Sequence, residues 1–189
     1  APPLPPMPPH PRIRLPERAL VEMKRQIAED SDANAMAKGL LAYADTLIPT
    51  PLVDCTPTGA NGALLSESRA VLDLVYSVGL AYRLTGKAKY FDRVKAELLR
   101  VSDPTHCIDG WEPPNFLAVS EMSHAVSVGY DWLYSNLTVD ERTKIEAAIL
   151  ANGLGAGAHS FATSEWWSHF EDNWNVVCNT GLAYAAVAV

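Results

Sequence analysis

The chain has 189 residues, of which 48% are hydrophobic and 20% charged, a balance that supports one folded domain with a sizeable core and argues against intrinsic disorder. Acidic residues outnumber basic ones by 22 to 15, which gives a net charge of −7, and the basic residues are scattered along the chain, which argues against nucleic-acid binding. Charged residues interrupt the apolar stretches well before the roughly 20 residues that a membrane span needs, so we expect no membrane-spanning segment.

Residues 1–15 form a proline-rich N-terminal segment that we expect to be extended and poorly packed. Proline fixes φ and lacks a backbone donor, so a run of prolines favours a polyproline-like conformation. A start at Ala1 followed by prolines is typical of a mature chain after signal-peptide removal, and it predicts a secreted or periplasmic protein. We interpret the segment as a tether, with a proline-rich docking ligand as the alternative.

Helical periodicity dominates residues 16–189, which we expect to form one helical domain. Apolar residues recur at intervals of three and four, and prolines and glycines separate the recurring stretches. In the first half, Thr50–Gly62 is a predicted loop and Gly86 is the corner of a helical hairpin. The predicted helices of this half are Arg12–Asp30, Asp32–Ile48, Ser66–Gly86 and a helix with Tyr90, Val94 and Leu98 on its apolar face.

The second half repeats this pattern of helices and loops. Ser102–Asn115 is a predicted loop, and Phe116–Tyr134 is a predicted helix. Thr138 and Glu141 have the spacing of a capping box, which opens a helix ending near Asn152. Gly153–Ser168 is rich in glycine and then in aromatic residues, and we predict a loop there. The predicted helices from Phe116 and Thr138 therefore form a further hairpin.

A last helix is expected from Asn173 onward, and its apolar Ala185–Val189 end shows no cap, glycine stop or partner in the sequence. This pattern predicts that the chain is a fragment of a longer protein. A weak internal repeat links Gly79–Tyr82, Gly129–Trp132 and Gly181–Tyr184, about fifty residues apart. Its glycines would let neighbouring helices approach closely. Such hairpins stack as an open solenoid or close into a toroid, and the period alone does not choose between them.

Three cysteines leave one unpaired if a disulfide forms. Cys55 and Cys107 lie in predicted loops and could pair in an oxidising compartment, whereas Cys178 lies in a helical pattern. Whether the first two are paired stays open. Asn136 begins a formal glycosylation sequon, but its third residue, Thr138, is more simply interpreted as the helix cap.

Polar residues at the start of the last helix are the first candidate site. Asn175 and Asn179 are four residues apart and share one helix face, with Asp172 just before them. A buried amide without partners costs about 1–3 kcal/mol, so these side chains indicate either a cleft or a structural polar network. Asn173 has the alternative interpretation of a helix N-cap. His169 has no accompanying ligand spacing, so we predict no metal site.

A polar stripe on the helix Phe116–Tyr134 is the second candidate. Glu121, His124, Asp131 and Ser135 follow one another at spacings of three, seven and four residues. The stripe either lines a cleft, with a direct role for His124, or forms a solvated face or a network between helices.

Aromatic residues in the two long loops are the third candidate site. Trp111, followed by Asn115, either stacks on a sugar or fills a gap in the core. The same choice applies to Trp166 and Trp167, although two adjacent indoles cannot both point into one core. Trp174 follows at the mouth of the last helix.

An ordered set of short motifs across nearly the whole chain resembles the helical domain of the heparinase II/III-like polysaccharide lyases. The motifs are His10–Pro16, Ser68–Ala70, Tyr82–Gly86, Pro113–Leu117, Ser120–Met122, Gly129–Tyr134 and Asn173–Asn179. The resemblance implies an all-α fold of repeated antiparallel hairpins that form part of an incomplete (α/α) toroid, normally followed by a β-sandwich domain. It further implies β-elimination of acidic polysaccharides that contain uronic acid, without a cofactor.

In that family, hydrogen-bond donors neutralise the uronate carboxylate while a tyrosine or histidine moves the proton. By position in the motif, Asn173 and Asn175 are the expected neutralising residues, and His169 and His124 are local candidates for proton transfer. The expected substrate contacts are Trp111, Asn115, Glu121, Trp166, Trp167, Trp174 and Asn179. Two alternatives stay open: a glycoside hydrolase, whose carboxylates would be Glu121 and Asp131, and a non-catalytic carbohydrate-binding module.

Overall fold

The computed structural model describes residues 7–55 and 63–189, and this part of the chain is helical, with connecting loops and no strand. The remaining residues, 1–6 and 56–62, include most of the N-terminal prolines and part of the predicted loop Thr50–Gly62. None of the helices in the described ranges is both long and apolar enough to span a membrane. The helices are α1 (Glu17–Glu29), α2 (Ser31–Leu47), α3 (Ala63–Leu74), α4 (Leu80–Thr85), α5 (Ala88–Val101), α6 (Phe116–Leu133), α7 (Val139–Ala148), α8 (Ala156–Ala162) and α9 (Asn173–Ala188).

The helix ends follow the local signals of the sequence. Thr138 and Glu141 form the predicted capping box at the start of α7. Gly86 ends α4 with a left-handed φ of 68°, as expected of a residue that closes a helical hairpin. At α2 the cap is Asp30, which accepts hydrogen bonds from the amides of Asp32 and Ala33, so the helix begins at Ser31.

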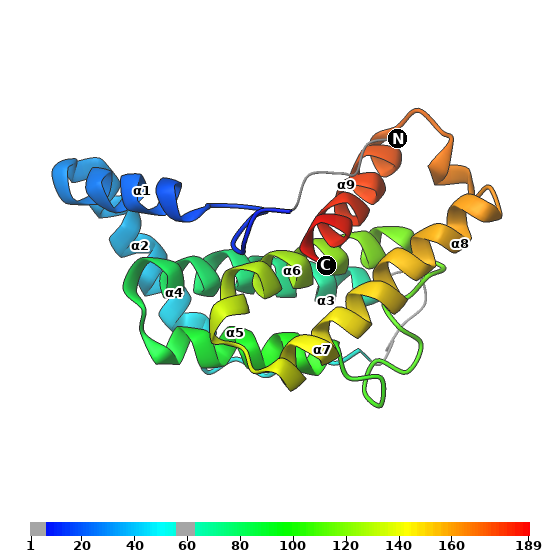
Figure 1. Cartoon of the computed structure of the whole chain (residues 1–189), viewed down its shortest axis with the longest axis horizontal. Helices are drawn as coiled ribbons and strands as arrows, with labels where there is room; N and C mark the ends of the chain where they lie inside the picture. Colours follow the sequence, from blue (N-terminus) through cyan, green and yellow to red (C-terminus); the bar gives the residue numbers. More distant parts are fainter. Residues whose placement is uncertain (1–6, 56–62) are drawn as a thin grey trace.

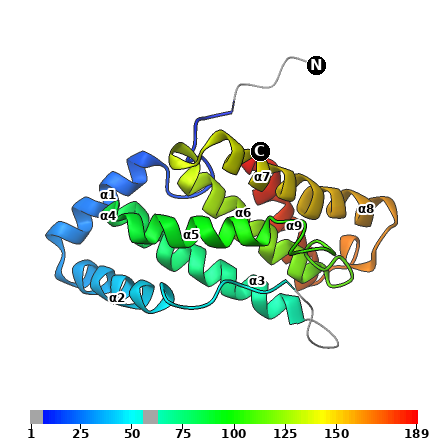
Figure 2. The same ribbon diagram turned by 90° about the horizontal axis from the view of Figure 1, so that it is seen from below.

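Two layers of helices make up most of the molecule (Figure 1, Figure 2). One layer holds α3 with its continuation through a π-helical turn (Val75–Gly79) into α4, then α6, then α9. The other holds α5 and the helical run from α7 to α8, which pack against α6 and its neighbours. Hairpin α1–α2 extends from one end. In this arrangement α6 is central, between α3 and α9.

The helices of the α6 layer run in the same direction. Ser68 Oγ of α3 donates to the carbonyl of Ala118 near the start of α6 (3.0 Å), and Ser120 Oγ of α6 donates to the carbonyl of Val177 near the start of α9 (2.6 Å). Contacts between later residues follow in the same order, because His124 stacks against Tyr184. The intervening helix α5 therefore runs in the opposite direction.

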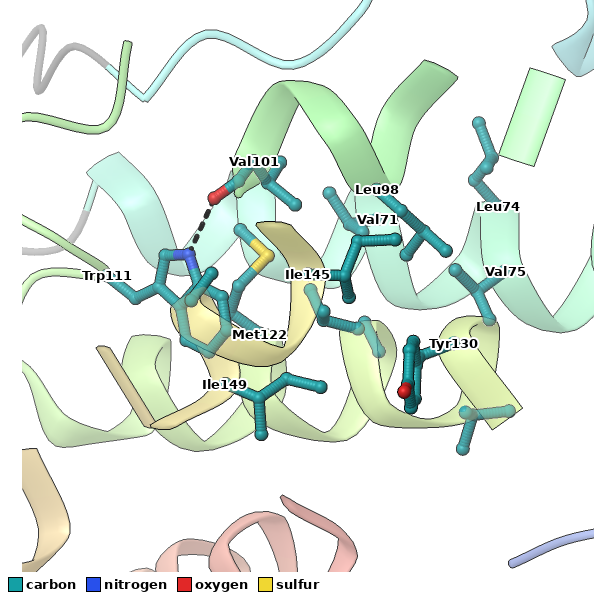
Figure 3. Packing of buried hydrophobic residues seen from close by; sticks show 14 of the residues in the cluster. Val71, Leu74, Val75, Leu98, Val101, Trp111, Met122, Tyr130, Ile145 and Ile149 are labelled. Atoms are coloured by element: carbon teal, nitrogen blue, oxygen red, sulfur yellow. Dashed lines mark hydrogen bonds between the residues drawn. The ribbon is translucent and has the colours of Figure 1, made fainter. Parts of the chain in front are cut away.

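The hydrophobic core lies between the layers (Figure 3). Val75, Leu98 and Ile145 contribute side chains to it from three different parts of the chain, and all are fully buried. Trp111 is also fully buried, and its Nε1 donates to the carbonyl of Val101 at 2.9 Å. The structure therefore favours the alternative in which Trp111 fills a gap in the core, because its indole is buried and its Nε1 donor is satisfied within the protein.

The three repeated glycines lie where helices pack closely against one another, as expected from the repeat. A Cβ atom on Gly181 of α9 would lie 2.2 Å from the carbonyl oxygen of Ser120 on α6. On Gly79 it would lie 3.0 Å from the ring of Trp132, and on Gly129 it would lie 2.8 Å from Cδ2 of Leu98. Absence of a side chain at these positions sets the spacing of the helices.

The prediction of a loop over Gly153–Ser168 is wrong for its first ten residues. Helix α7 continues through a π-helical segment (Ile149–Gly155) into α8, which ends at Ala162. Gly153 and Gly157 serve packing here: a Cβ would lie 2.7 Å from Ser123 Oγ at the first and 2.7 Å from Leu182 Cδ1 at the second. Several glycines in a short stretch are typical both of a turn and of a helix that packs closely against its neighbours, so the sequence alone did not distinguish the two.

The N-terminal segment is packed from His10 onward, contrary to the expected loose tether. Asp131 of α6 is fully buried, and its carboxylate accepts hydrogen bonds from His10 Nδ1 (2.6 Å) and from the amides of Arg12 (2.8 Å) and Ile13 (3.0 Å). A buried carboxylate requires such donors, and the segment supplies them. We call residues His10–Leu15 the strap.

The strap also contacts α9 near Val187 and Ala188. Arg12 donates from Nε to the carbonyl of Val187 and from Nη2 to that of Ala188, both at 2.8 Å. Helix α9 packs along its length on α6.

A disulfide joins Cys55 and Cys107, the pairing that the sequence left open. It links the segment after α2 to the loop after α5, across 52 residues. A buried ion pair lies on the same side: Arg93 and Glu97 of α5 contact each other, and Glu97 Oε1 accepts the amide of Val53 at 2.8 Å. Cys178 is a free, buried thiol, and burial raises its pKa to about 12.

We predict that Gly181→Ala destabilises the protein by about 1–3 kcal/mol, because the new methyl group would push α9 away from α6. Gly39→Ala in α2 is the matched control. In the described part of the chain, no neighbouring side chain or helix would lie within 4 Å of its added methyl group, so removal of glycine flexibility should stabilise by about 0.5–1 kcal/mol. Urea unfolding of both variants measures the difference. Equal stabilisation by the two substitutions would contradict the close contact.

Candidate functional site

One face of α6 carries polar side chains that remain partly open to solvent. From Ala118 to Leu133 the helix is buried except at Glu121 and His124, which are half-buried. These residues lie between α3 and α9, on the side of α6 away from α5 and α7. The strap crosses α6 further along, at Asp131 (Figure 1). This partly open face is the position of the candidate site.

His124 is the centre of a group of four side chains from four segments of the chain. Its Nε2 atom lies 2.8 Å from the hydroxyl of Tyr76, which belongs to the turn after α3. Its ring stacks on Tyr184 of α9, with centroids 4.0 Å apart. Arg14 of the strap donates from Nε to the Tyr184 hydroxyl at 2.5 Å, with its guanidinium 5.6 Å from the centre of that ring. We call Arg14, Tyr76, His124 and Tyr184 the His124 cluster.

Burial sets the protonation of this cluster. It lowers the pKa of His124 to about 4, and the positive charge of Arg14 acts in the same direction. It also raises the pKa of Tyr76 to about 12, with Tyr184 adding to this effect and Arg14 opposing it. The hydrogen bond with Tyr184 raises the pKa of Arg14, which stays charged. At neutral pH the cluster therefore combines a neutral imidazole, a protonated phenol and a fixed cation.

These groups have the chemistry of proton transfer beside a bound anion. A neutral imidazole accepts a proton, a phenol donates one, and a guanidinium binds a carboxylate through paired hydrogen bonds. The contact between Tyr76 and His124 lets a proton pass from one to the other. The cluster is therefore the best candidate for a catalytic site in the described part of the chain.

Glu121 lies one turn of α6 before His124 and is held by Arg69 of α3. Arg69 Nε contacts Glu121 Oε2 at 2.9 Å, and Nη2 contacts Oε1 at 3.1 Å. This fork-shaped ion pair borders the open face. The two carboxylates considered for a hydrolase are thus both engaged: Glu121 by Arg69, and Asp131 by the strap.

The predicted amide site at the start of α9 has a different geometry from the one expected. Asn175 Nδ2 donates to the carbonyls of Trp167 (3.0 Å) and Ser168 (3.1 Å), and so it holds the preceding loop against the helix. Asn179 Nδ2 donates to the carbonyl of Asn175 at 2.8 Å. These bonds favour the structural network over a substrate-binding role for both amides.

The N-cap of α9 is Asp172, whose carboxylate accepts the amide of Asn175 at 3.2 Å. The alternative that assigned the cap to Asn173 is therefore wrong by one residue, because Asn173 is already the first residue of the helix. Its side chain is exposed, as is that of His169. Both remain accessible to a ligand.

The aromatic residues before α9 separate into buried and exposed groups. Trp167 is 2% exposed and stacks on Phe116 with centroids 4.3 Å apart, which favours the alternative that it fills the core. Trp166 is 46% exposed and lies 5.0 Å from Trp174 and 6.1 Å from Phe170, measured between ring centroids. We call Trp166, Phe170 and Trp174 the aromatic surface. One indole points inward and the other outward, as the sequence predicted.

Asn115 holds the N-cap position of α6, but its side chain makes no capping hydrogen bond. Its Oδ1 atom is buried, and no hydrogen-bond partner is found for it within the described ranges. The side chain is only half-buried as a whole. Asn115 thus lies close to Phe116 and the core, away from the His124 cluster.

The His124 cluster and the aromatic surface lie at opposite ends of α9. Trp174 and Tyr184 are ten residues apart on α9, which corresponds to about 15 Å along the helix axis. Sequence reasoning identified His124 and the aromatic residues but missed Arg14, Tyr76 and Tyr184. Tyr184 belongs to the Gly181–Tyr184 repeat, which was the available signal, whereas Arg14 joins the cluster only through tertiary packing of the strap.

A comparison with models of known protein families gives no match, and neither does one with curated proteins. Within residues 7–55 and 63–189, no group of three or more His, Cys, Asp or Glu side chains is arranged to hold a metal ion.

We predict that His124 makes the protein less stable as the pH falls. Its pKa is about 4 in the folded state and about 6.5 when unfolded, so between these values the unfolded chain binds more protons. The stability that neutral His124 provides is full above pH 6.5 and declines toward pH 4. After allowance for partial exposure, we expect this loss to be about 1–2 kcal/mol.

Urea unfolding at pH 7 and pH 4.5 measures this effect as the difference between wild type and His124→Gln. The variant should lose less stability than wild type over this interval. His159→Gln, which changes an exposed histidine, is the control and should behave like wild type. An equal loss in wild type and His124→Gln would show that His124 ionises normally in the folded protein.

Proposed function

We propose that this chain belongs to a polysaccharide lyase that cleaves uronic-acid-containing polysaccharide by β-elimination. The observation that carries the proposal is the His124 cluster, in which a neutral imidazole, a protonated phenol and a cation meet on a partly open helix face. β-Elimination next to a carboxylate needs these functions: a cation to neutralise the carboxylate, a base for the adjacent proton and an acid for the leaving oxygen.

In the proposed reaction, Arg14 binds the uronate carboxylate and stabilises the negative charge that develops as the neighbouring C–H bond breaks. The proton passes to the Tyr76 oxygen while the Tyr76 hydroxyl proton moves to Nε2 of His124. A carbon–carbon double bond forms as the glycosidic C–O bond breaks, and the relay returns the proton to the departing oxygen. The imidazole then regains its neutral form, so the cycle requires no cofactor.

The arrangement of helices supports membership of the heparinase II/III-like lyases. Helices α3, α6 and α9 run parallel in one layer, and α5 and the α7–α8 run return in the other, as expected for consecutive hairpins of an (α/α) toroid. In this proposal the α6 layer is the inner one. The His124 cluster then faces the interior, where a toroid would bind its polysaccharide.

Two further observations support an extracellular carbohydrate substrate. The disulfide Cys55–Cys107 is typical of secreted or periplasmic proteins. The aromatic surface places the exposed Trp166 beside the half-buried Trp174 at the other end of α9 from the cluster, and indoles suit the apolar faces of sugar rings. A chain of several sugars is long enough to contact both.

The alternatives differ in how well the contacts support them. A glycoside hydrolase is less well supported because Glu121 and Asp131 are both engaged in internal contacts. A non-catalytic carbohydrate-binding module needs only the aromatic surface, and the structural contacts of Asn175 agree with it. Measurements of turnover and of binding separate these alternatives.

We predict that Tyr76→Phe lowers the turnover of the active protein by about 10²–10⁴-fold, because the proton relay loses its hydroxyl. The assay follows the ultraviolet absorbance of unsaturated uronate products from alginate, heparan sulfate and chondroitin. Tyr43→Phe, which removes a phenol bonded to Asp73 on another part of the surface, is the matched control and should keep activity. Absence of unsaturated product from all such substrates with wild type would refute the lyase proposal.

We predict that Trp166→Ala weakens oligosaccharide binding by about tenfold, since one exposed stacking face would be lost. Calorimetric titration with oligosaccharides of alginate, heparan sulfate and chondroitin measures the binding affinity. Phe161→Ala removes an aromatic ring that is also about half exposed but lies outside the aromatic surface, and binding should not change. Equal effects of the two substitutions would argue against a role for the aromatic surface.

A further inference from the structure

The strap brings a cation to the His124 cluster, because Arg14 donates a hydrogen bond to Tyr184. Arg14 lies in a segment without secondary structure, and its side chain is largely exposed, so contacts of neighbouring strap residues must hold it in place. We propose that Asp131 is a positioning residue: it anchors the strap and thereby holds the Arg14 guanidinium beside Tyr184. This inference rests on the proposed function, because it assigns Arg14 a role in that site.

Asp131 binds the strap through its backbone. The amide of Arg12 lies 2.8 Å from Oδ1 and 3.1 Å from Oδ2, and the amide of Ile13 lies 3.0 Å from Oδ2. His10 adds a third donor at 2.6 Å, and its ring stacks on Tyr134 with centroids 3.9 Å apart. Two consecutive amides on one carboxylate fix the direction in which the chain leaves toward Arg14.

The backbone at Arg14 and Leu15 is also held by side chains of α6 and α4. Trp132, the next residue of α6, donates from Nε1 to the carbonyl of Arg14 at 2.9 Å. Arg83 of α4 donates from Nη2 to the carbonyl of Leu15 at 3.1 Å. The backbone on both sides of Arg14 is therefore bound, while its side chain is free to point toward the cluster.

Asp131 acts at a distance from the chemistry. It is fully buried, and it lies seven residues after His124 on α6, about 10 Å along the axis. Its four contacts with the strap leave it no role as a substrate ligand. Its effect on the site must therefore pass through Arg14.

The experiment measures the pKa of His124 by NMR, without substrate, from the ring resonance that disappears in His124→Gln. The charged or titratable groups around this ring are Arg14, Tyr76 and Tyr184, with Glu121 one turn away on α6. Because Arg14 helps to keep the pKa low, Arg14→Gln should raise it by about 0.5–1 unit. Asp131→Asn should give the same rise, and the double variant should give no further rise.

Asp131→Asn should also expose the strap to protease. An asparagine must turn its NH₂ group toward one of the backbone amides, so the paired bonds are lost. Trypsin should then cut after Arg12 or Arg14 at least about tenfold faster than in wild type. Asp92→Asn, at an exposed carboxylate of α5, is the matched control and should change neither measurement.

If Asp131→Asn does not fold, His10→Phe provides a milder test. It keeps an aromatic ring to stack on Tyr134 and removes only the bond to Asp131, so it should give smaller changes in the same direction. A folded Asp131→Asn protein with a resistant strap and an unchanged His124 would overturn the inference. So would an Arg14→Gln protein in which the His124 pKa does not move.

Activity separates this inference from the proposed function. In the active protein, Asp131→Asn and Arg14→Gln should lower lyase turnover by the same factor, and the double variant should lower it no further. If wild type has no lyase activity but the NMR and trypsin results hold, the proposed function fails while the anchoring of Arg14 by Asp131 stands. If activity is present and the two single variants have additive effects, the positioning role fails.

Discussion

The buried carboxylate of Asp131 is the interaction on which the arrangement of the other parts depends. A charge removed from water is tolerated only where donors replace the lost solvent, and α6 itself has none to offer, because its amides are used within the helix. The strap supplies the amides of Arg12 and Ile13 together with His10. Satisfying one buried group therefore determines the path of the N-terminal segment.

Three parts of the molecule are joined as a consequence. Arg12, fixed by its own amide, reaches the carbonyls of Val187 and Ala188 in α9, and Arg14 reaches Tyr184 on the same helix. The close approach of α9 to α6 at Gly181 gives these contacts their geometry. The strap, α6 and α9 thus form one unit, and the partly open face of α6 carries the His124 cluster because these three segments meet beside it.

The sequence predicted those features that depend on local interactions. The helices follow apolar periodicity, and the capping box at Thr138 and the left-handed Gly86 follow from backbone chemistry within a few residues. The structural role of other residues depends on which side chains pack against them from distant parts of the chain. Gly153 lies in a glycine-rich stretch that is typical of a turn, but it packs against Ser123 within a helix. Trp111 lies in a loop sequence that is typical of a sugar-stacking residue, but its indole fills the core.

The candidate site likewise combines a residue that local sequence patterns identify with residues that only the tertiary fold brings together. His124 was identifiable as a polar residue on an apolar helix, whereas Arg14 and Tyr76 join it from segments 110 and 48 residues away in the chain. Asn175 looked like a ligand of substrate because unpartnered amides are costly, but its partners are carbonyls of a loop whose path the sequence does not specify. The toroid, the lyase reaction and the identity of the polysaccharide stay predictions.

The electrostatics of the cluster run opposite to those of the chain as a whole. The protein carries a net charge of −7, yet burial keeps His124 and Tyr76 neutral, so the charge that remains among these partners is the guanidinium of Arg14. At short range the cation of Arg14 acts more strongly than charges dispersed over the surface, whose effect salt screens. In the proposed function, this cation is what would bind an acidic substrate to an acidic protein, and the strap keeps it in place.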